Sequence, residues 1–145
     1  MLEIINEKWN WLNTYFIEII NENDFGNLIL LNDDKTIWRI CPEELQCEKI
    51  AENINQFNQL QKTIEFNEDW NLVFLKEIAF KKLGCLNKNE KYTLIKPGVL
   101  GGKYIEENLV KISFEKLIEF SADLAFQIKD LKDGQKFSFK IQNNI

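Results

Sequence analysis

Histidine is absent from this 145-residue sequence, and arginine occurs only once, at Arg39. Without histidine the chain lacks the usual general base at neutral pH and every Ser-His, Cys-His or His-metal arrangement. With a single arginine it also lacks the forked guanidinium groups that bind phosphate and guanine. Its net charge of -5 opposes binding to a polyanion. We therefore expect no nucleic acid among its partners.

The chain is also short of cysteine and of long apolar runs. Cys41, Cys47 and Cys85 form no C-x-x-C pair, which predicts reduced thiols rather than a disulfide framework or a zinc site. No segment approaches the roughly 18 consecutive apolar residues of a membrane span. The first residues lack the basic and apolar regions of a signal peptide. These absences predict a cytoplasmic protein that does not associate with membranes.

Carboxylates are the main remaining candidates for catalysis, and they occur as neighbours in predicted turns. Adjacent acids in turns usually point into water and shift the pKa of one another little. A hydrolase that depends on carboxylates would need two acids from separate elements in one cleft, and no motif indicates such a pair. We assign no catalytic residue, no metal ligand and no cofactor, and we expect the protein not to be an enzyme. The adjacent pairs are Asp33 and Asp34, Glu43 and Glu44, Glu68 and Asp69, and Glu106 and Glu107.

Apolar residues are plentiful, at 45% of the chain with eleven Phe and four Trp. A chain of this length buries roughly 70% of its unfolded surface, enough for one substantial core. We therefore expect one domain over residues 1–145. The pattern of its first part predicts a short helix followed by an antiparallel meander. A single helix over residues 1–20, in place of the short helix and the first strand, is the alternative. The predicted elements are a short helix over 5–13 and strands over 15–20, 26–31, 36–40 and 45–51.

Two helices are predicted between residues 52 and 84. Trp70, Phe74 and Ile78 are spaced four apart, as on one helical stripe. Asn67 or Asp69 is the predicted cap of the second helix. The predicted end of that helix carries two cations and a glycine, in keeping with the helix dipole and a left-handed terminus. These end residues are Lys81, Lys82 and Gly84.

The last third of the sequence continues with a strand, a helix and a strand. A short strand over 92–95 is stopped by Pro97, and Ser113 caps a strongly amphipathic helix that reaches Leu131. A turn at 133–134 then leads to an alternating strand over 136–142. The order of elements predicts an α+β fold with helices packed on a mainly antiparallel sheet.

The segment KPGVLGGKY, residues 96–104, concentrates three of the six glycines. It is not a phosphate-binding P-loop, because Tyr104 follows Gly102-Lys103 where that motif needs Ser or Thr. Proline fixes one backbone angle and glycine permits positive φ, so we interpret the segment as a structural corner. We expect Val99 and Leu100 to insert into the core, and a buried Tyr104 with a satisfied hydroxyl is favoured over a partner contact.

Six segments follow one another along the chain: FGNLILL, WRI, IAENINQF, NEDW, KYTLIKPGVLGGKYIEENL and QIKDLKDG. Together they resemble the C-terminal domain of the type VI secretion immunity protein that protects a bacterium from its own DNase effector. The resemblance covers about residues 5–142. It implies a cytosolic α+β protein that neutralises a cognate effector by binding, with a nuclease as one candidate class. The residues interpreted as fold-defining are Phe25, Gly26, Pro97, Gly101, Gly102 and Asn108.

An acidic protein would capture a basic effector through complementary charge. The candidate contact residues are Asp33, Asp34, Glu43, Glu44, Tyr104, Glu106 and Glu107. A module that binds a small ligand is the alternative, and it predicts an apolar cavity near Tyr92, Val99 and Tyr104. A homodimer is a further possibility, since the strand over 136–142 could lie at a sheet edge.

Overall fold

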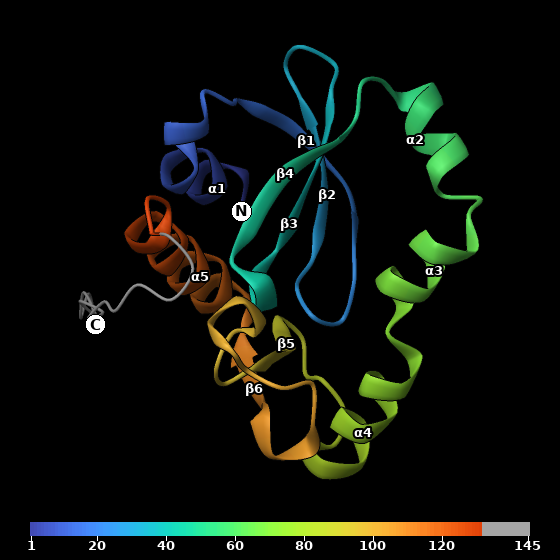
Figure 1. Ribbon diagram of the computed structural model, residues 1–145, viewed down its shortest axis with the longest axis vertical. Helices are drawn as coiled ribbons and strands as arrows, with labels where there is room; N and C mark the ends of the chain where they lie inside the picture. Colours follow the sequence, from blue (N-terminus) through green and yellow to red (C-terminus); the bar gives the residue numbers. More distant parts are fainter. Residues whose placement is uncertain (132–145) are drawn as a thin grey trace.

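The structure, a computed structural model, describes residues 1–131. Two antiparallel sheets lie within this part of the chain, with helices on both sides of the larger one (Figure 1). The predicted α+β class is confirmed. The predicted turn at 133–134 and the predicted strand over 136–142 lie outside the described residues.

The larger sheet is a four-stranded meander in the order β1-β2-β3-β4. It follows a short helix, as predicted, and the alternative of one helix over residues 1–20 is wrong. The chain leaves the helical region at Asn13, whose φ is 58°, a left-handed conformation that Asn tolerates. The elements are α1 (Leu2–Lys8), a 3-10 turn (Asn10–Leu12), β1 (Phe16–Glu22), β2 (Leu28–Asn32), β3 (Ile37–Cys41) and β4 (Gln46–Ala51).

The two faces of this sheet are covered by different helices. Successive residues of a strand point to opposite faces, so Leu28 and Leu30 lie in one core cluster and Ile29 in another. The first cluster joins the sheet to α1 and to α5 (Phe114–Ile128). The second joins it to Phe57 and Trp70 from the helices on the other side. The sheet is therefore the middle of three layers.

The segment between β4 and β5 (Glu90–Leu94) forms three helices rather than the two predicted. They are α2 (Ile54–Leu60), α3 (Ile64–Asn71) and α4 (Val73–Leu83). The predicted caps Asn67 and Asp69 are wrong. Asn53 caps α2 by accepting a hydrogen bond from the Gln56 N–H at 2.8 Å. Thr63 caps α3 in the same way, from the Phe66 N–H at 3.2 Å.

Leu72 separates α3 from α4, with a φ of 45°. This break turns the chain so that Trp70 packs on the sheet, whereas Phe74 points outward and is 84% exposed. Trp70, Phe74 and Ile78 therefore do not form one buried stripe, and the prediction from their spacing is wrong. The predicted end of the helix is confirmed, since α4 ends at Gly84 with a φ of 79°.

The smaller sheet pairs β5 (Glu90–Leu94) with β6 (Leu109–Ser113). The strand before Pro97 was predicted, but β6 was not, because the run LVKIS is short and partly exposed. Ser113 caps α5 as predicted, accepting from the Lys116 N–H at 3.3 Å. The helix stops at Ile128 and does not reach Leu131. Nowhere in residues 1–131 does a helix combine the length and apolar character that a membrane crossing requires.

Candidate functional site

The glycine corner, residues 96–104, connects the two strands of the smaller sheet. Pro97 precedes a short 3-10 turn, Gly98–Leu100, and Gly101 then takes a φ of 92°. The N–H of Gly102 donates to the carbonyl of Pro97 at 3.0 Å. A Cβ on Gly102 would lie 1.8 Å from the carbonyl oxygen of Lys96. Gly102 therefore sits where the backbone folds back against itself too closely for any side chain.

The side chain of Asn108 closes the corner. Its amide accepts a hydrogen bond from the Lys96 N–H and donates to the carbonyls of Lys96 and Lys103, each at 2.9 Å. Leu100 packs against the core, as expected. Val99 is exposed, so the expectation that it inserts into the core is wrong. The corner is held by polar contacts of its own backbone more than by apolar insertion.

The corner lies against the 3-10 turn Pro42–Glu44 that joins β3 to β4. A Cβ on Gly98 would lie 1.8 Å from Oε1 of Glu44, and the Tyr104 hydroxyl donates to the same carboxylate oxygen. Burial and this bond raise the pKa of Tyr104. The tyrosine is nevertheless 42% exposed, so the expectation of a buried ring is wrong although its hydroxyl is satisfied. Its ring is available for contact.

A buried polar network lies beneath this turn. Glu43 is only 3% exposed, and the Asn27 amide nitrogen donates to its two oxygens at 3.0 and 2.8 Å. The Asn27 oxygen in turn accepts from Nε and Nη2 of Arg39, at 3.0 and 2.7 Å. Arg39 also pairs with Asp69 and lies 5.3 Å from the centre of the Trp70 ring. The only arginine thus ties β3 to α3.

The expectation that adjacent acids both point into water is wrong for Glu43 and Glu44, because Glu43 is buried. The turn that carries it is directed inward, and Leu45 follows it with a φ of 54°. Burial raises the pKa of Glu43, against the lowering effects of its bonds and of the Arg39 charge. Burial also raises the pKa of the Cys41 thiol, and that of Cys47 to about 12. These two cysteines and the exposed Cys85 are free, as predicted.

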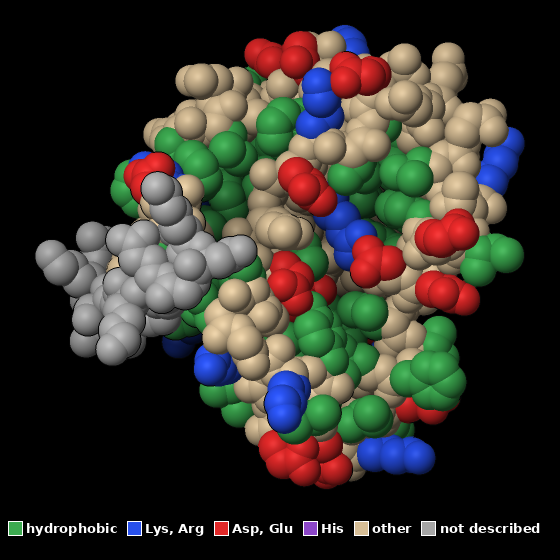
Figure 2. Space-filling view, in the orientation of Figure 1, with side chains coloured by type: hydrophobic (Ala, Val, Ile, Leu, Met, Phe, Trp, Pro, Cys, Tyr) green, Lys and Arg blue, Asp and Glu red, His purple; other side chains and the backbone are tan. Residues whose placement is uncertain are grey.

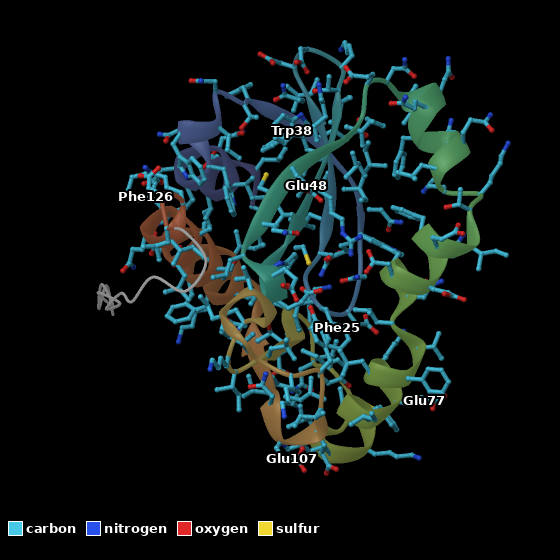
Figure 3. All side chains as sticks on the ribbon, viewed as in Figure 1. Phe25, Trp38, Glu48, Glu77, Glu107 and Phe126 are labelled. Carbon is cyan, nitrogen blue, oxygen red and sulfur yellow. The ribbon has the colours of Figure 1, made fainter. Side chains whose placement is uncertain are left out.

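A cleft of about 190 Å³ opens above this network. Figure 2 shows Asp and Glu side chains gathered over the middle of this face with a basic side chain between them. Figure 3 labels Glu48 there, on β4. We name this hollow the acidic cleft. It is lined by Arg39, Cys41, Glu43, Glu44, Gln46, Glu48, Asp69, Leu72 and Tyr104.

Three of the predicted contact residues, Glu43, Glu44 and Tyr104, line the acidic cleft, although Glu43 forms its buried floor rather than its surface. The other four do not line it. Asp33 and Asp34 lie in the turn between β2 and β3, where Asp34 accepts from the Thr36 hydroxyl and N–H, and these bonds lower its pKa. Glu106 and Glu107 are exposed on the turn before β6, and Figure 3 places Glu107 at the far end of the molecule from the cleft.

Sequence reasoning missed Asn27, Arg39, Glu48 and Asp69 as parts of the site. Only Arg39 could have indicated this site from the sequence, because it is an isolated cation in a predicted strand beside Trp38. A half-buried cation of this kind needs an acidic or amide partner. The partners of Arg39 come from α3 and the loop before β2, which no sequence spacing connects to β3. Convergence of these separate elements is a product of the fold.

The FGN loop, residues 25–27, holds Asn27 above Glu43. Phe25 is buried in the core under the smaller sheet, and the Asn23 side chain accepts from the N–H groups of Phe25 and Asn27, both at 3.0 Å. Gly26 has a φ of 72°, and a Cβ there would lie 2.7 Å from Cδ2 of Leu117. The loop can therefore approach α5 closely only with glycine at this position.

A second hollow, the apolar groove, runs along α4 with a volume of about 710 Å³. Val73, Phe80, Leu86 and Tyr92 supply much of its wall. The predicted cavity shared by Tyr92, Val99 and Tyr104 is not formed. Tyr92 lines the groove, Tyr104 lines the acidic cleft, and Val99 lines neither. Within the described residues no cluster of His, Cys, Asp and Glu is arranged to hold a metal ion.

Comparisons with known proteins give two positive findings. A family model described as T6SS immunity protein Tdi1, C-terminal, matches residues 51–125. The fold is similar to that in the crystal structure of Atu4351 from Agrobacterium tumefaciens, with a TM-score of 0.52 and 17% identity. The alignment covers 83% of this chain and 61% of that one, so this chain spans about three fifths of that protein's length. A search of curated proteins found no match.

At a sequence identity of 17%, the similarity to this structure supports the fold and nothing further. The family match is more informative, because residues 51–125 make up just over half of the chain. They run from the end of β4 into α5 and include the whole glycine corner, Asp69 and Asn108. The chain therefore belongs to the family of the C-terminal domain of the T6SS immunity protein Tdi1.

Proposed function

We propose that this protein is an immunity protein that binds a cognate type VI effector in the cytoplasm and blocks it by direct contact, without turnover. The observation that carries the proposal is the match of residues 51–125 to an immunity-protein family. Inhibition of this kind needs a stable, complementary surface rather than catalytic groups. The protein presents such a surface on the face that contains the acidic cleft.

The acidic cleft suits a basic region of the effector. The positive charge of Arg39 is already engaged by Asn27 and Asp69, which leaves Glu44 and Glu48 to set the charge at the opening. Complementary charge accelerates encounter and penalises wrong partners. Because the network beneath is hydrogen-bonded before any partner arrives, little ordering is needed on binding.

Tyr104 adds an apolar contact at the rim of the cleft. Tyrosine is enriched among residues that dominate binding energy, and its ring here is accessible while its hydroxyl is fixed by Glu44. Three further apolar side chains near the corner, Ile95, Val99 and Ile105, are also exposed. A tyrosine at the rim of a charged hollow, with exposed aliphatic side chains on the same loop, is a favourable arrangement for a protein partner.

The apolar groove is the observation that favours a small-ligand module instead. Its volume lies within the usual range of about 300–1,000 Å³ for ligand sites. However, Lys76 and Asp24, two of its charged side chains, already pair with each other at 2.9 Å. Its other two charged side chains, Glu77 and Lys81, are exposed to solvent, whereas ligand sites rely on enclosed polar groups that fix the orientation of the ligand.

The proposal is tested by capturing partners from a lysate of the source species with the tagged protein. Each captured protein is then expressed in a second host with and without this chain. An effector that arrests growth alone, and is tolerated in the presence of this chain, supports immunity. If every captured protein is harmless by itself, or if the chain never restores growth, immunity is the wrong function.

The contact face is tested by charge reversal with a matched control. We expect Glu48→Lys to weaken binding of the purified effector about tenfold, and more at low salt, because it places a cation at the cleft. Glu107→Lys makes the same change of charge at a distant exposed site and is expected to leave affinity within about twofold. Equal effects of the two variants would show that net charge, rather than the cleft, governs binding.

A further inference from the structure

Helix α4 carries apolar side chains on both its inner and its outer side. Leu75 and Ala79 are buried against the smaller sheet. On the outer side Val73 is 58% exposed, Phe80 is 54% exposed and Phe74 is the most exposed of the three. Large apolar side chains gathered on one exposed surface mark an interaction site.

Two charges of opposite sign, Glu77 and Lys81, lie on this outer face one helical turn apart. Neither forms an ion pair within residues 1–131, and both are exposed. Together they are neutral, so the face does not select a partner by net charge as the acidic cleft does. It is complementary to a surface that carries the same two charges in the opposite order.

We propose that the outer face of α4 binds a second copy of this chain, with the two α4 helices antiparallel around a twofold axis. A twofold interface is isologous, so each contact occurs twice. With the axis on the outer face, midway along the helix between Glu77 and Lys81, Glu77 of one copy faces Lys81 of the other. This pair recurs on the other side of the axis.

The ends of the helix are also complementary in this register. Phe74, near the start of α4, faces Gly84 at the end of the partner helix. The position of a Cβ on Gly84 has nothing within 4 Å, so space is available for an aromatic ring there. Beyond it, Cys85 and Leu86 line the apolar groove. The Phe74 ring of one copy would thus insert at the end of the apolar groove of the other copy.

This interface and the acidic cleft lie on different parts of the molecule. Figure 3 labels Glu77 on α4 at the outer edge, and Glu48 on β4 over the centre. Figure 2 shows hydrophobic side chains at the outer edge over α4. The residues that carry this inference are not those proposed to contact the effector, and the inference does not depend on the proposed immunity function.

Sedimentation equilibrium over a range of concentrations tests the proposal on the full chain. We expect the wild type to form dimers, and Phe74→Asp to raise the dimer dissociation constant at least about 30-fold, because a charge replaces a large apolar contact that occurs twice in the interface. Circular dichroism should be unchanged, and so should the Tm at concentrations at which the wild type is monomeric, since Phe74 contacts no core cluster. A wild type that stays monomeric at all concentrations overturns the proposal, as does a Phe74→Asp variant that dimerises normally.

Charge exchange tests the antiparallel register itself. Glu77→Lys and Lys81→Glu alone should each weaken the dimer about tenfold, because each places like charges opposite one another twice. The double variant exchanges the two charges and should restore dimerisation to within about threefold of the wild type. Failure of this rescue overturns the proposed axis. A monomeric wild type whose Phe74→Asp variant loses effector binding would instead assign the face to the effector and reject the second copy.

Discussion

The glycine corner and the outer face of α4 are opposites in how the chain holds them. In the corner, backbone and side-chain polar groups bond to one another, and two glycines sit where a Cβ would collide with neighbouring atoms. On α4, large apolar side chains extend from a regular helix and have few neighbours. The corner is thus determined from within, whereas the large apolar side chains on the outer face of α4 lie open to solvent.

This contrast separates a conspicuous motif from a binding surface. The glycines of the corner position Tyr104 and Glu44 beside the acidic cleft, and their own contacts are internal. The residues available to partners, such as Glu48 and Phe74, belong to ordinary stretches of strand and helix. An unusual sequence composition therefore locates the scaffold of the site more directly than it locates the site.

The largest effect is expected where the corner is tightest. Gly102→Ala should destabilise the protein by about 3 kcal/mol or more, or prevent folding, because its Cβ would meet the carbonyl oxygen of Lys96 in the backbone. Gly101→Ala is the matched control. It has a positive φ but its nearest neighbour is a flexible lysine end 3.7 Å away, so a cost of about 1–2 kcal/mol is expected. Urea unfolding measures both, and equal costs would contradict the role given to Gly102.

The buried network should give the next largest effect. Glu43→Ala leaves the Asn27 amide N–H group without its carboxylate acceptor in a buried site and should destabilise the fold by about 3 kcal/mol. Glu43→Gln keeps one acceptor oxygen and the shape of the side chain, so its cost at neutral pH should be smaller. Chemical unfolding at pH 7 ranks the two variants. An alanine variant as stable as the wild type would show that the network does not stabilise the fold.

The same residue predicts a pH dependence with a definite sign. Because burial raises the pKa of Glu43 above its ordinary 4.5, the folded chain binds this proton more tightly than the unfolded chain. The resulting stabilisation is complete below the ordinary pKa and is lost as the pH rises through the folded pKa. The wild type should therefore gain stability relative to Glu43→Gln as the pH falls from 7 towards 5. A constant difference across this window would contradict the raised pKa.

Features that depend on neighbouring residues could be predicted from the sequence, whereas features that depend on contacts between distant segments could not. The meander, the Ser113 cap and the end of α4 at Gly84 were predictable because each depends on neighbouring residues. The break at Leu72 was not, since a leucine with positive φ has no local signal and is imposed by the packing of Trp70 on the sheet. The buried position of Glu43 was missed for a similar reason: its partner Asn27 lies on another strand connection.

The smallest effect is expected at the surfaces that meet partners. Tyr104→Phe removes a hydroxyl bonded to Glu44 at a half-exposed site, and should change the free energy of unfolding by less than about 1 kcal/mol. The free energy of effector binding should change by more than the free energy of unfolding, because Glu44 loses the hydroxyl group that orients it at the cleft. Thermal unfolding and effector titration of the same variant separate the two quantities. A large loss of stability would show that Tyr104 mainly stabilises the glycine corner. It would then belong to the part of the fold that supports the cleft, rather than to the binding surface.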